Sequence, residues 1–423
     1  MAATLRTGTQ PPCPGLWTVV VVAAGVMSIS MGLRQCFGLF LGPVGIDLGV
    51  SAASFGFAVA LHNLVWGLSQ PFVGALGDRY GPRPVLLGCG ALYAVGLGLM
   101  ASSHVPWVGL DVGIGMLTGL GIAGTGFGVL LGSVSRAAPP ERRSSLVGFV
   151  SGAGSAGILL LAPFGQGLIT GLGWRASAWG LAAVCVAMMA LSVLIGGRPA
   201  RAETASGAEA PPFGLGETVR AAMSHPGFVA MAIAFFACGF QLTFITTHLP
   251  RFLGLCGLPP TVGARALGVI GLCNAFGSYA FGLLGQRHSR KRLLAVIYVV
   301  RTLAIMAYIA APVSEASTLV FAAVMGATWL GVVPLVSGLV GKLFGLGRFN
   351  LLFGILLFGI VFLGHQVGCF AGAWIGGAIL DATGSYDAAW YALVGVGLAA
   401  ALLQWPMDDR PRMPRPARLA AAE

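Results

Sequence analysis

A single positive charge stands inside the first long apolar run of the sequence. Arg34 and Gln35 lie in the stretch SMGLRQCFGLF (residues 30–40), and no other residue of that run is charged. Arg34 precedes Pro43 by nine residues, which in a helix places it about 13 Å from the end of the run. A guanidinium is costly in lipid unless it faces a wet cavity or a partner, and its fork matches a carboxylate. We therefore expect Arg34 either to hold an anionic group or to bind backbone carbonyls of interrupted helices.

Other polar side chains inside apolar runs could complete a site around this charge. None of the 13 Asp and Glu residues lies deep in such a run, so proton transfer there would fall to histidine, whose pKa is ordinarily near 6.5. A packing role with satisfied hydrogen bonds is the competing interpretation for each histidine. The candidates for proton coupling are His62, His248 and His365, and the further candidates for binding are Gln241, Thr243, Asn274 and Gln366.

The composition indicates the solvent in which these residues must be positioned. Of 423 residues, 57% are hydrophobic and only 9% are charged, whereas a soluble domain has about 25% charged residues. The chain therefore fits a bilayer rather than water. The first run lacks the short core and small-residue cleavage site of a secretory signal, which indicates a membrane span rather than a removable peptide.

Twelve apolar runs have the length that a membrane-spanning helix needs, about 20 residues. They are continuous rather than alternating, which favours helices that satisfy their own backbone. The sequence thus predicts an all-α membrane protein. The expected spans are 17–41, 52–76, 85–102, 108–133, 145–169, 176–196, 227–250, 262–285, 293–311, 316–341, 350–380 and 388–405.

The distribution of basic residues predicts the orientation. If the N-terminus is cytoplasmic, 19 of the 24 Lys and Arg residues fall in cytoplasmic loops and tails. Only Arg175, Arg251 and Arg265 fall on the other side, and Arg34 and Arg301 lie within spans. This bias predicts a multi-pass protein of the inner (cytoplasmic) membrane with both termini in the cytoplasm. It also accounts for the net charge of +11 without nucleic acid as a partner.

A polar segment divides the spans into two sets of six. The domains expected are 1–196, a six-helix bundle, 197–225, a cytoplasmic linker, and 226–423, a second bundle with a short basic tail. GALGDRYGPR (74–83) aligns with GLLGQRHSRK (282–291) after the second span of each half. Pseudo-symmetric six-span halves are a transporter architecture with the substrate site between them.

The same loop resembles the signature of the major facilitator superfamily. It matches that pattern at Gly74, Asp78, Arg79, Gly81 and Arg83. Further stretches resemble the bacterial branch related to monocarboxylate porters and oxalate–formate exchangers: MGLRQCFGLFLGP, TTHLP, TWLGVVPLVSGLVGKLFG and FLGHQVGCFAGAWIGGAILDATGSYDAAW.

The resemblance implies an alternating-access carrier in which the matched loop is a gating latch between the halves. It places the first helix and the eleventh at the central cavity, so the implied substrate-binding residues are Arg34, Gln35, Gln241, Asn274, His365 and Gln366. The chain departs from the animal monocarboxylate carriers, because their first-span lysine falls at Gln35 and their eighth-span Asp and Arg fall at Asn274 and Ser278. The ninth helix is peripheral in this fold, so Arg301 is expected to tie helices together.

These observations favour a secondary transporter for a small organic anion such as a monocarboxylate, acting as a monomer. The alternative is an exporter of drugs or xenobiotics with the same fold, in which Arg34 has no substrate role. The eight cysteines are scattered without a CxxC pair, so no metal or cofactor is expected. The glycines of GTGFG lack the strand and the GK[ST] ending of a phosphate loop. No constellation of acid, base or nucleophile indicates an enzyme, and no long polar segment indicates a sensor domain.

Overall fold

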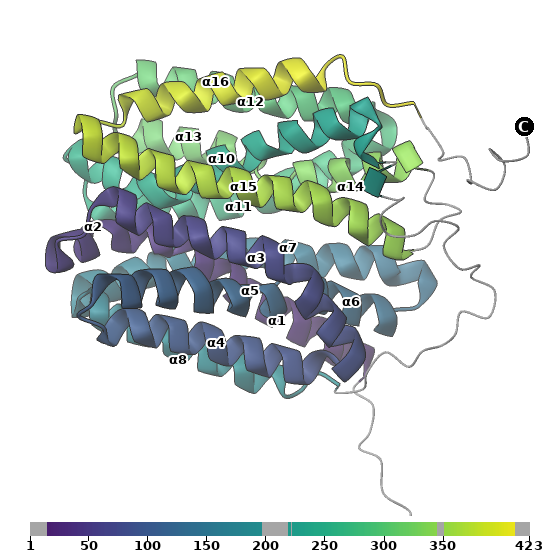
Figure 1. Cartoon of the computed structure of the whole chain (residues 1–423), viewed down its shortest axis with the longest axis horizontal. Coiled ribbons are helices and arrows are strands. Elements are labelled where there is room, and N and C mark those ends of the chain that lie inside the picture. The colour runs from purple at the N-terminus through teal and green to yellow at the C-terminus, as the bar shows by residue number, and fades with distance from the viewer. Residues whose placement is uncertain (1–14, 197–218, 221, 345–350, 411–423) are drawn as a thin grey trace, which may run out of the picture.

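The computed structural model describes residues 15–196, 219–220, 222–344 and 351–410. Within these residues there is no strand, and twelve helices are long and apolar enough to cross a membrane. This confirms the predicted all-α fold with twelve spans. The helices run side by side, with the purple and blue helices of the first half beneath the teal to yellow helices of the second (Figure 1).

The first six spans contain nine helical elements. They are α1 (Leu16–Gln35), α2 (Phe37–Leu48), α3 (Ala52–Tyr80), α4 (Pro82–Ser102), the π-helix η1 (Val108–Thr118), α5 (Gly119–Thr125), α6 (Phe127–Ala137), α7 (Pro140–Leu172) and α8 (Trp174–Ser192). The last six spans contain seven helices, since α13 and α14 share one span: α10 (Pro226–Leu255), α11 (Pro260–Arg287), α12 (Arg290–Ala310), α13 (Glu315–Ala327), α14 (Val332–Phe344), α15 (Leu351–Thr383) and α16 (Asp387–Gln404).

Besides the junction of α1 and α2 at Cys36, where the backbone stays helical, two spans that the sequence predicts as continuous are interrupted. The fourth span breaks at Gly126, where an extended backbone (φ −95°, ψ −152°) separates α5 from α6. The tenth span breaks between Ala327 and Val332. A break inside lipid exposes backbone polar groups, and these must find protein partners. The side chains that meet this need at the second break come from neighbouring helices, as described below.

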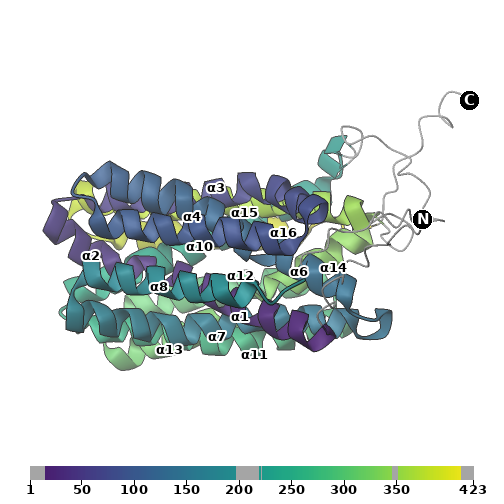
Figure 2. The ribbon, with the colours of Figure 1, turned by 90° about the horizontal axis from the view of Figure 1, so that it is seen from below.

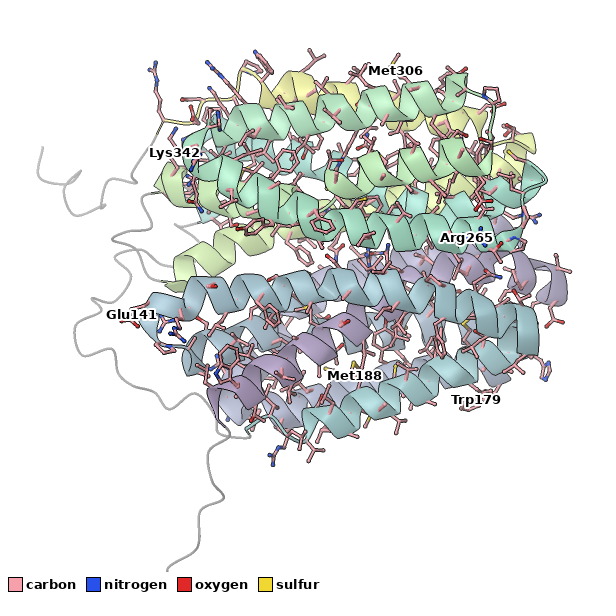
Figure 3. The ribbon with its side chains drawn as sticks, turned by 180° about the vertical axis from the view of Figure 1, so that it is seen from behind. Glu141, Trp179, Met188, Arg265, Met306 and Lys342 are labelled. Atoms are coloured by element: carbon pink, nitrogen blue, oxygen red, sulfur yellow. The ribbon has the colours of Figure 1, made fainter. Side chains whose placement is uncertain are left out.

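The charged residues gather at the two ends of the helices. We call the end at which α3, α6, α11 and α14 finish the basic end, because most Arg and Lys residues of the described helix ends and turns lie there. In Figure 3, Glu141 and Lys342 lie at this end and Arg265 lies at the opposite end. Seen from below, the helices keep the same common direction (Figure 2). Because the number of spans is even, the start of α1 and the end of α16 lie at the same end, the basic one.

The internal repeat has a matching structural role in both halves. Gly77 in the last turn of α3 packs against Val129 of α6, and Gly285 in the last turn of α11 packs against Leu335 of α14. An added Cβ would lie 3.3 Å and 2.7 Å from these side chains. Both glycines therefore let a helix approach the second segment of an interrupted span. The division at 197–225 stays a prediction, since residues 197–218 and 221 lie outside the described residues.

The two halves contact each other tightly toward the end opposite the basic one. There Gly56 of α3 lies against the carbonyl of Ala373, and Gly377 of α15 lies against the carbonyl of Ala52. An added Cβ would meet these oxygens at 2.3 Å and 2.2 Å, so only glycine allows this spacing. Gly38 of α2 is packed as closely, 2.0 Å by the same measure, against the carbonyl of Thr246 on α10. This end of the interface is closed.

The second interhelical seam, between α7 and α11, is closed only over part of its length. Asn274 of α11 donates to Ser155 of α7 at 2.8 Å, and Gly271 packs against Leu159. One and two turns toward the basic end, on the same face of α7, a Cβ at Gly152 or Gly148 would meet no atom of the described residues within 4 Å. The seam thus loosens toward the basic end.

Candidate functional site

Arg34 projects from the last turn of α1 onto α3. Its Nη2 donates to Oδ1 of Asn63 at 2.8 Å, and its guanidinium carbon lies 5.3 Å from the centre of the Trp66 ring. Its Nε is buried and has no hydrogen-bond partner. No Asp or Glu of the described residues forms an ion pair with Arg34, because all five ion pairs lie at the helix ends. The guanidinium is therefore held in place while its charge is left without a counter-charge.

A small pocket opens beside this guanidinium. It is lined by Arg34, Phe37, Gly38, Val59, His62, Asn63, Thr243, Thr246 and Thr247. It has room for little more than a water molecule in this conformation. The polar groups of one wall come from the first half of the chain, and the threonine hydroxyls of the other wall come from α10 in the second half. A group bound here would sit between the two halves.

The three candidate histidines lie in different surroundings. The Nδ1 of His62 is 2.8 Å from the Thr118 hydroxyl, whereas its Nε2 is buried without a partner and the residue lines the pocket. The Nδ1 of His365 also lacks a partner, and its ring lies against Phe235 with 4.8 Å between ring centres. Only His62 combines an unpaired ring nitrogen with a place in the pocket wall.

His248 is fully engaged by its neighbours. Its Nδ1 is 2.9 Å from the hydroxyl of Tyr386, and its Nε2 is 2.7 Å from the carbonyl oxygen of Ala373. These bonds tie α10 to α15 and to the loop before α16. Since the carbonyl can only accept, the ring donates there, and both ring nitrogens are engaged by protein groups.

The predicted binding residues are only partly brought together. Gln241 donates to the carbonyl of Leu393 on α16 at 3.1 Å and so points away from Arg34. Asn274 is occupied at the α7–α11 seam. Gln366 is buried on α15 against Gly67 of α3, and neither end of its amide has a partner. Gln35 is also buried, with Nε2 unpaired, but it does not line the pocket.

Arg301 fills the break in the tenth span. It is completely buried on α12 and donates to the carbonyl oxygens of Thr328 and Trp329, the second at 2.6 Å. Asn274 accepts from the backbone N–H of Leu330 at 2.9 Å in the same break. The freed backbone groups thereby gain partners, and the expected helix-tying role of Arg301 agrees with these bonds.

The residues of the predicted gating loop find their partners within the first half. Asp78 pairs with Arg136 of α6 at 2.9 Å, and Nε of Arg83 donates to the carbonyl of Ile195 at 3.0 Å. Gly81 has a positive φ of 88°, which joins α3 to α4 in a turn that favours glycine. Gly74 and Arg79 lie beside this turn, the latter 5.3 Å over the ring of Tyr80. A latch between the halves stays a prediction.

Several pocket residues were missed by the sequence reasoning. Asn63, Thr246 and Thr247 line the pocket, but in these stretches the sequence reasoning singled out only the nearby His62, Thr243 and His248. The available signal was a polar pair inside an apolar run, His62–Asn63 on α3 and Thr246–Thr247 on α10. Trp66 lies beneath the guanidinium of Arg34.

Comparison with known proteins places the chain among membrane carriers. The rat (Rattus norvegicus) protein Monocarboxylate transporter 13 is 27% identical over 397 residues, covering 93% of this chain and 89% of that protein. The Oxalate:formate antiporter of Oxalobacter formigenes is 26% identical over 253 residues, 58% of each chain. The mouse (Mus musculus) Monocarboxylate transporter 11 is 33% identical over 186 residues, covering 44% of this chain and 41% of that protein.

The sequence model of one family covers most of the chain. The model described as Major Facilitator Superfamily matches residues 21–359, which includes most of the first half, the second half as far as the start of α15, the pocket wall on α3 and α10, and the turn at Gly81. The twelve helices described above agree with this match. The chain therefore belongs to the Major Facilitator Superfamily, a family of multi-pass membrane transporters.

Proposed function

We propose that this transporter carries a small organic anion, such as a monocarboxylate, by alternating access. The observation that carries the proposal is the half-buried guanidinium of Arg34, whose buried Nε has no hydrogen-bond partner and which has no acidic partner in the described chain. A charge in such a place is stabilised when an anion binds, and a carboxylate can accept two N–H bonds from the guanidinium fork. The relatives named for monocarboxylates and for oxalate and formate support this class of substrate.

The position of the pocket suits alternating access. Arg34, His62 and Asn63 belong to the first half, and Thr243, Thr246 and Thr247 belong to the second. When the halves rock against each other, an anion held on Arg34 would lose its contacts on α10 and gain a path to one side. The contacts at Gly38, Gly56 and Gly377 close the end opposite the basic one. From this conformation we therefore expect the pocket to open toward the basic end. That end is the cytoplasmic one if the basic loops face the cytoplasm of an inner membrane.

Proton coupling, if the carrier has it, would run through His62. A proton on His62 would be repelled by the charge of Arg34 until an anion neutralises it. Anion and proton would therefore bind together, which makes symport the natural mode. His365 is the second candidate, and Gln35 and Gln366 would extend the polar wall when the halves move apart. We expect a monomer to suffice, since the pocket is built from one chain.

Uptake by proteoliposomes of the full chain tests the proposal. The probes are carbon-14-labelled acetate, lactate, pyruvate and oxalate, with wild type, Arg34→Lys, Arg34→Ala and the control Arg265→Ala. Arg265 is an exposed arginine paired with Glu315 at 2.5 Å, and it does not line the pocket. We expect Arg34→Ala to abolish uptake, Arg34→Lys to raise KM because lysine lacks the planar fork, and the control to behave as wild type.

Thermal-shift measurements with the same carboxylates and with neutral drug-like compounds distinguish the organic-anion carrier from the alternative, an exporter of xenobiotics. Stabilisation of wild type by carboxylates, lost in Arg34→Ala, agrees with the proposal. A shift only with neutral compounds would favour an exporter of xenobiotics. Stabilisation by carboxylates that survives Arg34→Ala would remove this residue from the site.

A further inference from the structure

Asn63 makes two hydrogen bonds that fix both ends of its amide. It is completely buried on α3; its Nδ2 donates to the carbonyl of Val59 at 2.8 Å, and its Oδ1 accepts from Arg34 at 2.8 Å. A carbonyl can only accept and a guanidinium can only donate, so this orientation of the amide is the one that satisfies both neighbours. The oxygen of Asn63 is therefore held toward Arg34 by a bond to its own helix.

The same helix supports the guanidinium from a second direction. Trp66 lies about one turn beyond Asn63 on α3, and its ring lies under the guanidinium carbon at 5.3 Å. The indole is itself fixed, because its Nε1 donates to Gln70 at 2.7 Å. Asn63 holds an edge of the guanidinium and Trp66 holds its face. The Nε–H then remains for a ligand, and a ligand there would complete the hydrogen bonding of this buried group.

The chemistry of position 63 decides whether the charge of Arg34 is available. An amide oxygen orients a guanidinium without neutralising it, whereas a carboxylate of the same shape would form a buried ion pair with it. With aspartate at this place the protein would supply its own anion. With asparagine the guanidinium keeps its charge, and the anion has to come from outside.

We propose that Asn63 is the positioning residue of the site: it aims Arg34 and, by being neutral, leaves its charge for the substrate. This inference rests on the proposed function and adds a residue and a charge rule to it. Asn63 acts through Arg34, so the proposal requires no contact between its amide and the anion. Two substitutions of similar size separate the orientation of the Arg34 guanidinium from the availability of its charge. Asn63→Leu removes the hydrogen bond to Arg34 and keeps the charge free. Asn63→Asp keeps the hydrogen bond to Arg34 and supplies a counter-charge, at the cost of the bond to the Val59 carbonyl.

The uptake assay with labelled acetate, lactate, pyruvate and oxalate tests the two roles. We expect Asn63→Leu to raise KM roughly tenfold with a smaller change in kcat, since one hydrogen bond to a charged group is lost. We expect Asn63→Asp to lose saturable uptake although it binds Arg34. Unchanged KM in both variants, with wild type active, would overturn the positioning role and leave the proposed function standing.

A substrate-independent measurement keeps the two proposals separable. Melting temperatures are measured for wild type, Asn63→Asp, Arg34→Leu and the double variant. If position 63 acts through Arg34, Asn63→Asp is tolerated in the presence of Arg34 and strongly destabilising with Arg34→Leu, which leaves a buried carboxylate unpaired. Additive effects in this cycle would overturn the inference. Should wild type take up none of the four carboxylates, the proposed function fails, and the cycle alone decides whether Asn63 sets the charge of Arg34.

Discussion

The carboxylate of Asp381 accepts hydrogen bonds from the backbone N–H groups of Ala53 at 2.7 Å and of Ala52 at 3.0 Å. Asp381 lies near the end of α15 in the second half, and the two alanines begin α3 in the first half. The first N–H groups of a helix have no partner within the helix, and its positive end favours an anion. One side chain thus closes the interface of the halves at the end opposite the basic one.

Asn in place of Asp381 is expected to loosen this closed end. The amide keeps one acceptor but lacks the charge, so the closed population should fall about threefold or more relative to the open one. The change can be measured as the distance distribution between spin labels at Ile46 and Thr383, in a background with Cys256→Ser. Both label positions are exposed near this end. Asp387→Asn is the matched control, and an equal effect of the control would contradict the assignment.

Gly38 provides a steric test of the same closure. A Cβ at this position would lie 2.0 Å from the carbonyl oxygen of Thr246, and backbone there cannot rotate away as a side chain can. Gly38→Ala should therefore separate α2 from α10 and favour the conformation open at this end. Gly42, one turn further along α2, has only ordinary contact with Arg251 at 4.0 Å, so Gly42→Ala should leave the label distances unchanged. Identical distances in both variants would show that the contact yields without opening.

The span count, the fold and the internal repeat could be predicted from the sequence because each depends on local composition. Length and hydropathy define a span without knowledge of its neighbours. The break between α13 and α14 could not be predicted this way, because its backbone groups are satisfied by Arg301 and Asn274 from other helices. A run such as TWLG reads as continuous until those partners are placed against it.

The site shows the same limit. The cost of a charge in lipid singled out Arg34, and this required only its own surroundings in the sequence. The role of Asn63 depends on the packing of α3 against α1, which places its amide beside Arg34. Gln241 does not line the pocket in this conformation because its side chain donates to Leu393 on α16. Polarity inside a span identifies candidates, but the face on which each one lies is settled by helix packing.

Arg301 and Arg34 should respond differently to the loss of the guanidinium. Arg301→Ala leaves the carbonyls of Thr328 and Trp329 unpaired in a dry break, which we expect to cost about 2–4 kcal/mol and to lower the melting temperature. Arg34→Ala removes an uncompensated charge and should lower it much less. Thermal unfolding of the two variants in the same detergent measures the contrast. A larger loss in Arg34→Ala would indicate that Arg34 is the structural arginine.

Substitutions of His62 and of His248 should affect the pH dependence of uptake differently. If a proton enters with the anion on His62, lowering the pH on the side of uptake should stimulate wild-type transport, and His62→Gln should remove this stimulation, since glutamine binds no proton in this range. His248→Gln should keep the stimulation and lower the melting temperature, because the ties to Tyr386 and Ala373 are weakened. Initial rates of carboxylate uptake from pH 5.5 to 8 give the comparison, in the range where an ordinary histidine titrates. If the stimulation persists in His62→Gln and disappears in His248→Gln, the proton is bound at His248 instead. If it persists in both variants, the proton is bound at His365 or by the carboxylic acid itself.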